Sequence, residues 1–145
     1  MKKFDFPLQK VLEYKVHLQK QEQNILGQLQ YEYNQMLAQM NGLLAEFERC
    51  KDEYLQKSQE GASAKSICLL GGYLRELQNK ILELNKRLFE KAEQIEHQRA
   101  KLLNVTKEKT SLEKLRDKSY DNYQFLARKE DERFIDEFVS STAAG

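Results

Sequence analysis

Hydrophobic residues recur at helical spacing along nearly the whole chain. In the first half, steps of three or four residues separate successive members of one long row, as in an amphipathic helix. Two consecutive steps of four between Ile25 and Tyr33 resemble a stutter, which locally unwinds a coiled coil. Pro7 is expected in the opening turn, where proline costs least. The row comprises Phe4, Leu8, Val11, Lys15 (which interrupts the apolar stripe), Leu18, Glu22, Ile25, Leu29, Tyr33, Met36, Met40, Leu43, Phe47, Cys50 and Tyr54.

The second half follows a stricter alternation of steps of four and three residues, which is typical of a coiled-coil seam. Gly71 and Gly72 lie inside this pattern and should each cost about 1 kcal/mol relative to alanine. They mark a later helix start, a kink or a surface that a partner approaches closely. The row comprises Leu70, Leu74, Leu77, Ile81, Leu84, Leu88, Lys91, Ile95, Gln98, Leu102, Val105, Lys109, Leu112, Arg116, Ser119, Tyr123 and Leu126.

The only segment typical of a loop lies at residues 58–65, where Gly61 can supply a positive φ after a helix. A short loop makes two long helices antiparallel neighbours. The sequence therefore predicts an all-α fold with one domain over residues 1–145, a long antiparallel two-helix coiled-coil hairpin. The helices are expected over about 4–57 and 66–138, with a disordered tail at 139–145. Folding at Gly61 places Phe4 opposite Ser119, so the longer second helix overhangs the first by roughly 20 residues.

Composition narrows the class of protein further. The chain has 145 residues, 24 basic and 23 acidic, for a net charge of +1. It lacks the basic excess that drives phosphate binding, so no nucleic acid is expected as a partner. No stretch approaches the roughly 18 apolar residues that span a bilayer, and no signal peptide is recognised. Cys50 and Cys68 are expected as reduced core thiols of a cytoplasmic protein.

The sequence contains almost no residue pattern typical of a catalytic site. Gly71-Gly72 lacks the ending of a phosphate-binding loop, and His17 and His97 lie eighty positions apart, outside any metal-ligand spacing. Neighbouring acidic residues such as Asp52-Glu53 point to different sides of a helix, and a two-helix hairpin offers them no sheltered cleft. We therefore expect no enzyme activity, no cofactor, no metal and no small-molecule substrate.

Two aromatic groups remain as candidate binding surfaces. The overhanging end keeps large apolar side chains that no first helix covers, which indicates either a frayed tail or a helix that docks into a partner's groove or bore. The second group lies near the loop and includes Phe47, Tyr54, Tyr73 and Leu77. Packing along the seam explains that group as well, because aromatic residues at helical spacing usually lie in the core.

Three stretches, in order, resemble the flagellar export protein FliJ family. They are the opening Phe4-Asp-Phe6-Pro-Leu8-Gln-Lys-Val11, the middle Tyr73-Leu74-Arg-Glu-Leu77-Gln-Asn-Lys-Ile81, and the ending from Leu112 through Tyr120-Asp-Asn-Tyr123 to Phe134-Ile135-Asp136-Glu137. The resemblance implies a non-enzymatic antiparallel hairpin of the flagellar type III export apparatus, similar to the shaft of a rotary ATPase and active in flagellum biogenesis and motility. It further implies a place in the centre of the export ATPase hexamer, at the cytoplasmic face of the inner membrane.

The same resemblance implies three partners: the ATPase ring, the cytoplasmic domain of the export gate, and export chaperones. We expect the ring to contact the apolar terminal end, at Phe4, Leu8, Tyr120, Tyr123, Leu126, Phe134 and Phe138. Carried over by position, the gate-binding surface corresponds to Phe47, Cys50, Tyr54, Tyr73, Leu77, Lys80 and Leu84. Lys80 and Leu84 depart from the small and imidazole side chains of the family pattern. The alternative is a generic coiled-coil tether or scaffold that self-associates through its exposed end.

Overall fold

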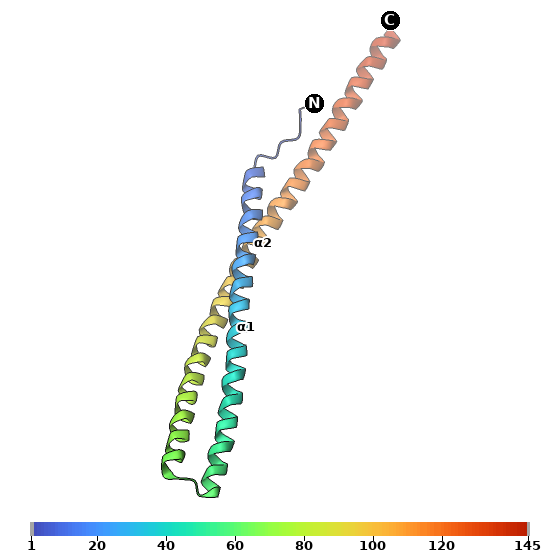
Figure 1. The fold of residues 1–145 in the computed structure, drawn as a ribbon. Helices are drawn as coiled ribbons and strands as arrows, with labels where there is room; N and C mark the ends of the chain where they lie inside the picture. Colours follow the sequence, from blue (N-terminus) through green and yellow to red (C-terminus); the bar gives the residue numbers. More distant parts are fainter. Residues whose placement is uncertain (1, 145) are drawn as a thin grey trace. The chain divides into compact units, whose positions relative to one another are not determined.

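A computed structural model, which describes residues 2–144, consists of two α-helices and the short loop between them (Figure 1). Helix α1 spans Gln9–Glu60 and has 52 residues, and helix α2 spans Ala64–Ala144 and has 81 residues. The described residues include no β-strand. The two helices pack against each other. The predicted all-α hairpin with a longer second helix is therefore confirmed.

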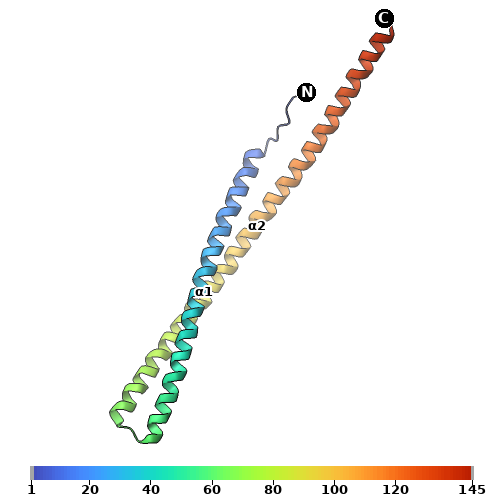
Figure 2. The ribbon, with the colours of Figure 1, turned by 45° about the vertical axis from the view of Figure 1, so that its right-hand side comes forward.

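Contacts divide the chain into two compact units, and each contains a stretch of α1 beside a stretch of α2. The loop unit comprises Gln23–Ala100 and includes the turn between the helices, which both ribbon views show (Figure 2). The terminal unit comprises the residues up to Glu22 and those from Lys101 onward. The predicted gate-binding residues all belong to the loop unit, and the predicted ring-binding residues all belong to the terminal unit.

The loop is shorter than residues 58–65 because both helix ends are capped. Gly61 has a φ of 75°, and the N–H of Ala62 donates to the carbonyl oxygen of Lys57 at 3.0 Å. This bond satisfies a carbonyl group that the end of α1 would otherwise leave unpaired. Ser63 caps α2, because its Oγ accepts a hydrogen bond from the N–H of Ser66 at 3.3 Å. Only residues 61–63 therefore lie between the helices.

Helix α1 begins at Gln9, not near Phe4 as the sequence pattern predicted. The physical reason is Pro7, whose ring disfavours the helical conformation for the residue before it. The segment before α1 ends in a turn in which the N–H of Gln9 donates to the carbonyl oxygen of Phe6 at 3.0 Å. The Phe6 side chain is buried, which anchors the non-helical segment.

Helix α2 continues to Ala144, so the predicted end at residue 138 is wrong, and so is the disordered tail over residues 139–144. Gly145 lies outside the described residues. No glycine or proline interrupts the helix between Val139 and Ala144, and Thr142 Oγ1 donates to the carbonyl oxygen of Phe138 at 2.8 Å. Gly71 and Gly72 lie inside α2, so they do not mark its start.

The inner positions of α1 form an uninterrupted alternation of steps of three and four residues, without the predicted stutter. Leu26 lies on the inner side, whereas Ile25 is 46% exposed. Both residues are apolar and adjacent, so spacing alone could not choose between them. The inner residues are Leu12, Lys15, Gln19, Glu22, Leu26, Leu29, Tyr33, Met36, Met40, Leu43, Phe47, Cys50, Tyr54 and Lys57.

The predicted row of α2 is buried or partly buried at every position except Arg116 and Leu126, which are exposed. In the loop unit, Met40 of α1 packs with Leu84 and Leu88 of α2 to form the hydrophobic core cluster. The partly buried side chains packed against this cluster are Tyr33, Met36, Leu43 and Ile81. The core is one layer thick, because two helices can bury only the sides that face each other.

Polar residues at inner positions of one helix meet polar residues of the other. In the terminal unit Lys15 forms an ion pair with Glu108, and the Gln19 amide donates to Thr106 Oγ1 at 3.0 Å. Lys109 donates to Gln19 Oε1, also at 3.0 Å. Because these groups find partners across the seam, they are tolerated at inner positions and favour this alignment of the helices over shifted ones.

Candidate docking surfaces

The terminal unit contains an aromatic cluster that joins the N-terminal segment to α2. The Phe4 ring lies 5.1 Å from the Tyr120 ring in an edge-on arrangement and 5.4 Å from the Tyr123 ring. The two tyrosine rings are stacked at 6.3 Å. The Tyr123 hydroxyl also donates to the carbonyl oxygen of Lys2 at 2.6 Å. Three of the predicted ring-binding residues therefore contact one another and tie down the segment before α1.

The other predicted ring-binding residues are exposed. Leu8 is 38% exposed and Leu126 is 50% exposed, while Phe134 and Phe138 reach 69% and 64%. Every residue from Arg128 to Ala144 is exposed, because no other part of the described chain covers this stretch of α2. We call Phe134 and Phe138, together with their exposed neighbours Ile135 and Val139, the terminal apolar face.

Several residues of the terminal unit were missed by the sequence reasoning. Phe6 is buried although it precedes the first helix. Ile135 and Val139 are 57% and 58% exposed and lie four residues apart, on one side of the helix. Lys129 lies over the ring of Phe125, with its Nζ 5.1 Å from the ring centroid.

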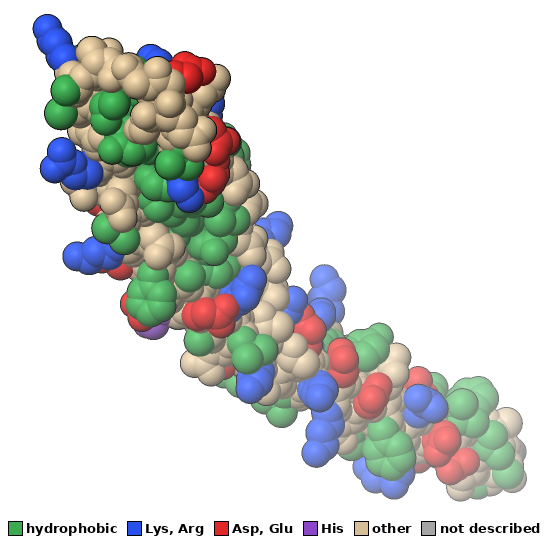
Figure 3. Space-filling view, turned by 90° about the horizontal axis from the view of Figure 1, so that it is seen from below, with side chains coloured by type: hydrophobic (Ala, Val, Ile, Leu, Met, Phe, Trp, Pro, Cys, Tyr) green, Lys and Arg blue, Asp and Glu red, His purple; other side chains and the backbone are tan. Residues whose placement is uncertain are grey.

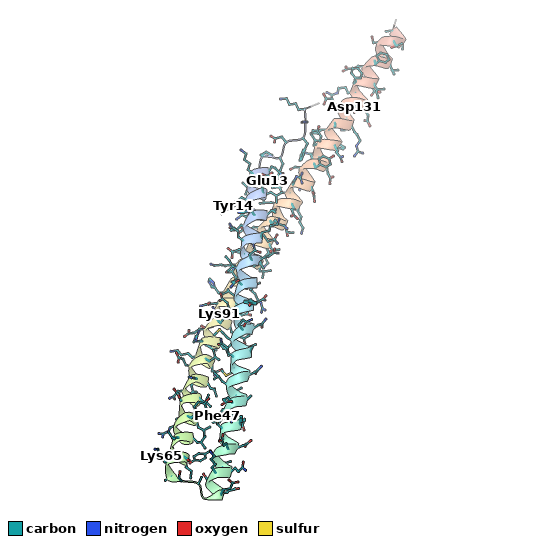
Figure 4. The ribbon with its side chains drawn as sticks, viewed as in Figure 1. Glu13, Tyr14, Phe47, Lys65, Lys91 and Asp131 are labelled. Atoms are coloured by element: carbon teal, nitrogen blue, oxygen red, sulfur yellow. The ribbon has the colours of Figure 1, made fainter. Side chains whose placement is uncertain are left out.

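The predicted gate-binding residues of the loop unit differ widely in burial. Cys50, Leu77 and Leu84 are 1%, 3% and 5% exposed and belong to the contact between the helices. Phe47, labelled on α1 in Figure 4, is partly buried, as is Tyr54. Tyr73 and Lys80 are exposed. Of the seven predicted gate-binding residues, only these two are exposed.

A charged network borders the predicted gate-binding residues. Arg49 pairs with Glu46 at 2.6 Å and with Glu53 at 3.3 Å, and the Tyr73 hydroxyl donates to Glu46 Oε1 at 3.2 Å. The hydrogen bond from Arg49 holds the pKa of Glu46 at about 2, well below its ordinary value. Partial burial raises the pKa of Tyr73, and the bond to Glu46 adds to this effect. This network links the surface of α1 to that of α2.

The two thiols have different environments. Cys50 is buried at the inner side of α1, and burial raises the pKa of its thiol. Cys68 is exposed on the first turns of α2, so the expectation of two core thiols is wrong for Cys68. The inner row of α2 passes through residues 70, 74 and 77, and Cys68 lies outside it.

The surface of the loop unit carries hydrophobic side chains as well as charges. Figure 3 shows a band of hydrophobic side chains over the part of the molecule nearest the viewer. Leu82 and Phe89, seven residues apart on α2, are 62% and 67% exposed. His17 and His97 are both exposed. Within residues 2–144, no group of three or more potential ligands could hold a metal ion, and no helix is long and apolar enough to cross a membrane.

These features define the class of protein: an all-α antiparallel helical hairpin with apolar side chains left exposed on its surface. Residues 4–145 match the family described as Flagellar FliJ protein. The chain therefore belongs to the FliJ family, a family of non-catalytic components of the flagellar export apparatus. No curated protein and no solved structure matches the chain significantly.

Proposed function

We propose that this protein is the central stalk and regulator of the flagellar export ATPase. In this role it links the ATPase ring to the export gate and assists the handling of export chaperones. The match to the FliJ family over residues 4–145 is the observation that carries the proposal. The exposure of Phe134 and Phe138 on α2 supports the proposal, because large aromatic side chains are typical anchors at protein interfaces.

The proposal assigns the terminal apolar face to the ATPase ring. A helix binds a groove through anchors spaced by three, four or seven residues. Phe134 and Phe138 have this spacing, and Ile135 and Val139 repeat it beside them. In the loop unit, Tyr73 and Lys80 are the predicted gate-binding residues accessible to the export gate.

The test is ATP hydrolysis by the cognate flagellar export ATPase, with and without this protein, together with the oligomeric state of the ATPase. We expect stimulation and ring formation. The variant Phe134→Ala/Phe138→Ala should bind more weakly and keep its helicity. Phe89→Ala is a matched control, because Phe89 is 67% exposed and lies in the loop unit.

Absence of any effect on hydrolysis and assembly would contradict the proposal. Self-association in that case would support the second candidate, a coiled-coil tether or scaffold. The specific observation in favour of this alternative is the set of large apolar side chains exposed on both units. Concentration-dependent sedimentation separates the two functions, because the tether predicts dimers or tetramers without the ATPase.

A further inference from the structure

The charged side chains three and four positions from Phe134 are all acidic. On a helix, the neighbours of a residue are those three and four positions away. For Phe134 these are Glu130, Asp131, Glu137 and Phe138. Asp131 is labelled on this stretch of α2 in Figure 4. We call Glu130, Asp131 and Glu137 the acidic collar of the terminal apolar face.

The acidic collar is unpaired, whereas several other carboxylates of the molecule have partners. In the loop unit Glu32 pairs with Lys91 at 2.7 Å, and Glu46 pairs with Arg49 at 2.6 Å. In the terminal unit Glu108 pairs with Lys15. Within the described residues, no collar carboxylate forms an ion pair or a side-chain hydrogen bond. Arg133 lies three positions from Glu130 and four from Glu137, yet in the described part of the chain it pairs with neither carboxylate.

The same side of α2 already receives an aromatic ring elsewhere in the terminal unit. Tyr120 and Phe134 are 14 residues apart, which is close to four full turns, so they lie on one side of the helix. Tyr120 contacts Phe4 of the N-terminal segment. The side of α2 on which Tyr120 packs against Phe4 thus continues to Phe134 and Phe138, which no described residue covers and which the acidic collar borders.

We infer that the groove that receives Phe134 and Phe138 is apolar at its centre and lined with lysine or arginine side chains at its rim. This inference rests on the proposed function and specifies the site on the ATPase ring. Apolar anchors at the centre of an interface provide most of its affinity, whereas complementary charges at the rim select the partner and set the alignment. A basic rim would pair the carboxylates that this chain leaves unpaired.

A second copy of this chain fits the face less well. Pairing the terminal apolar faces of two copies with each other would place the acidic collars of both chains around one interface. Like charges at such an interface are costly and suppress the wrong partner. Charge complementarity therefore favours a basic partner over self-association.

The experiment compares two charge reversals with the same change in net charge. Glu130→Lys/Glu137→Lys reverses two residues of the acidic collar. Glu83→Lys/Glu90→Lys reverses two exposed glutamates of α2 with the same spacing of seven residues, in the loop unit and away from the terminal apolar face. Binding to the purified export ATPase and the concentration for half-maximal stimulation are measured at low and high salt.

The collar reversal should weaken binding about tenfold or more at low salt, and the control reversal should change it by less than about threefold. The dependence on salt should be smaller for the collar variant than for the native chain. Equal weakening by both reversals would overturn the inference, since general attraction would then explain it. The inference would also be overturned if the collar variant binds as the native chain does while Phe134→Ala/Phe138→Ala loses binding. That result would leave the proposed function intact. If the native chain neither binds nor stimulates the ATPase, the proposed function itself fails.

Discussion

The hydroxyl of Tyr123 donates a hydrogen bond to the backbone carbonyl oxygen of Lys2 at 2.6 Å, although the two residues are 121 positions apart. The bond fastens the beginning of the chain to α2. Phe4 strengthens this attachment through its ring contacts with Tyr120 and Tyr123. The N-terminal segment is therefore held by these aromatic contacts, one hydrogen bond and the buried Phe6 side chain, without a helix of its own.

Replacement of Phe4 should release this segment. An edge-on aromatic pair contributes about 0.5–1.5 kcal/mol beyond the burial of its area. In the variant Phe4→Ala, the amide hydrogen of Gln9, which donates to the Phe6 carbonyl oxygen, should exchange faster, and those in the middle of α1 should not. Hydrogen exchange followed by mass spectrometry measures both. Phe125→Ala is the control, because Phe125 is 55% exposed and does not contact Phe4. Unchanged exchange in Phe4→Ala would contradict the role of the cluster.

Burial separates two leucines that are close in sequence. Leu84 is 5% exposed, whereas Leu82 is 62% exposed. Leu84→Ala should lower the free energy of unfolding by about 2–5 kcal/mol, because it removes packing and leaves a cavity. Leu82→Ala should change it by less than about 0.5 kcal/mol. Urea unfolding followed by circular dichroism measures the difference. A change of less than about 0.5 kcal/mol in Leu84→Ala would contradict the place of Leu84 in the hairpin core.

Gly72 offers a stabilising substitution. It lies inside α2, and a Cβ at this position would meet nothing within 4 Å. Gly72→Ala should raise the free energy of unfolding by about 1 kcal/mol, the difference in helix propensity. Gly61→Ala should have the opposite sign, because Gly61 has a φ of 75° and a left-handed conformation costs other residues about 1–2 kcal/mol. Thermal unfolding measures both, and a destabilised Gly72→Ala variant would indicate a contact that this fold does not explain.

The ion pair of Glu46 predicts a dependence of stability on acidic pH. The pKa of Glu46 is about 2 in the folded chain, below its ordinary value of 4.5, because Arg49 stabilises the charged form. The folded state therefore gains from the charged carboxylate above pH 4.5 and loses this gain as the pH falls toward 2. Carbon NMR of the Glu46 carboxyl group measures the titration. In Arg49→Gln the pKa should rise toward the ordinary value, and no change would contradict the assignment of Arg49 as the cause.

Much of the fold could be predicted from the sequence because helical periodicity is a local property. The alternation from Leu70 to Leu112 marks the inner side of α2 correctly, and Gly61 marks the turn. The capped ends were harder to place. The start of α2 depends on Ser63, whose side chain caps the helix. The start of α1 depends on Pro7, which keeps the residue before it out of the helical conformation.

The candidate surfaces were less predictable than the fold. The sequence marks aromatic and apolar side chains, but the same residue types serve the core and an exposed face. Tyr123 and Phe134 both lie on α2, yet the first is engaged with the N-terminal segment and the second is 69% exposed. Cys50 and Leu77 were grouped with Tyr73, although only Tyr73 is exposed.

Two long helices, a turn at Gly61 and a resemblance to the FliJ family could all be inferred before any tertiary contact was known. The helices and the turn depend on spacing and composition, which each segment carries alone, whereas the resemblance depends on three sequence stretches in order. The tertiary structure decided that Leu26 and not Ile25 faces α2, and that Phe4 packs on Tyr120. It also decided that Phe134 and Phe138 remain uncovered. The reason is physical: burial depends on what the opposite helix and the N-terminal segment place against each side chain, and local spacing does not contain that information.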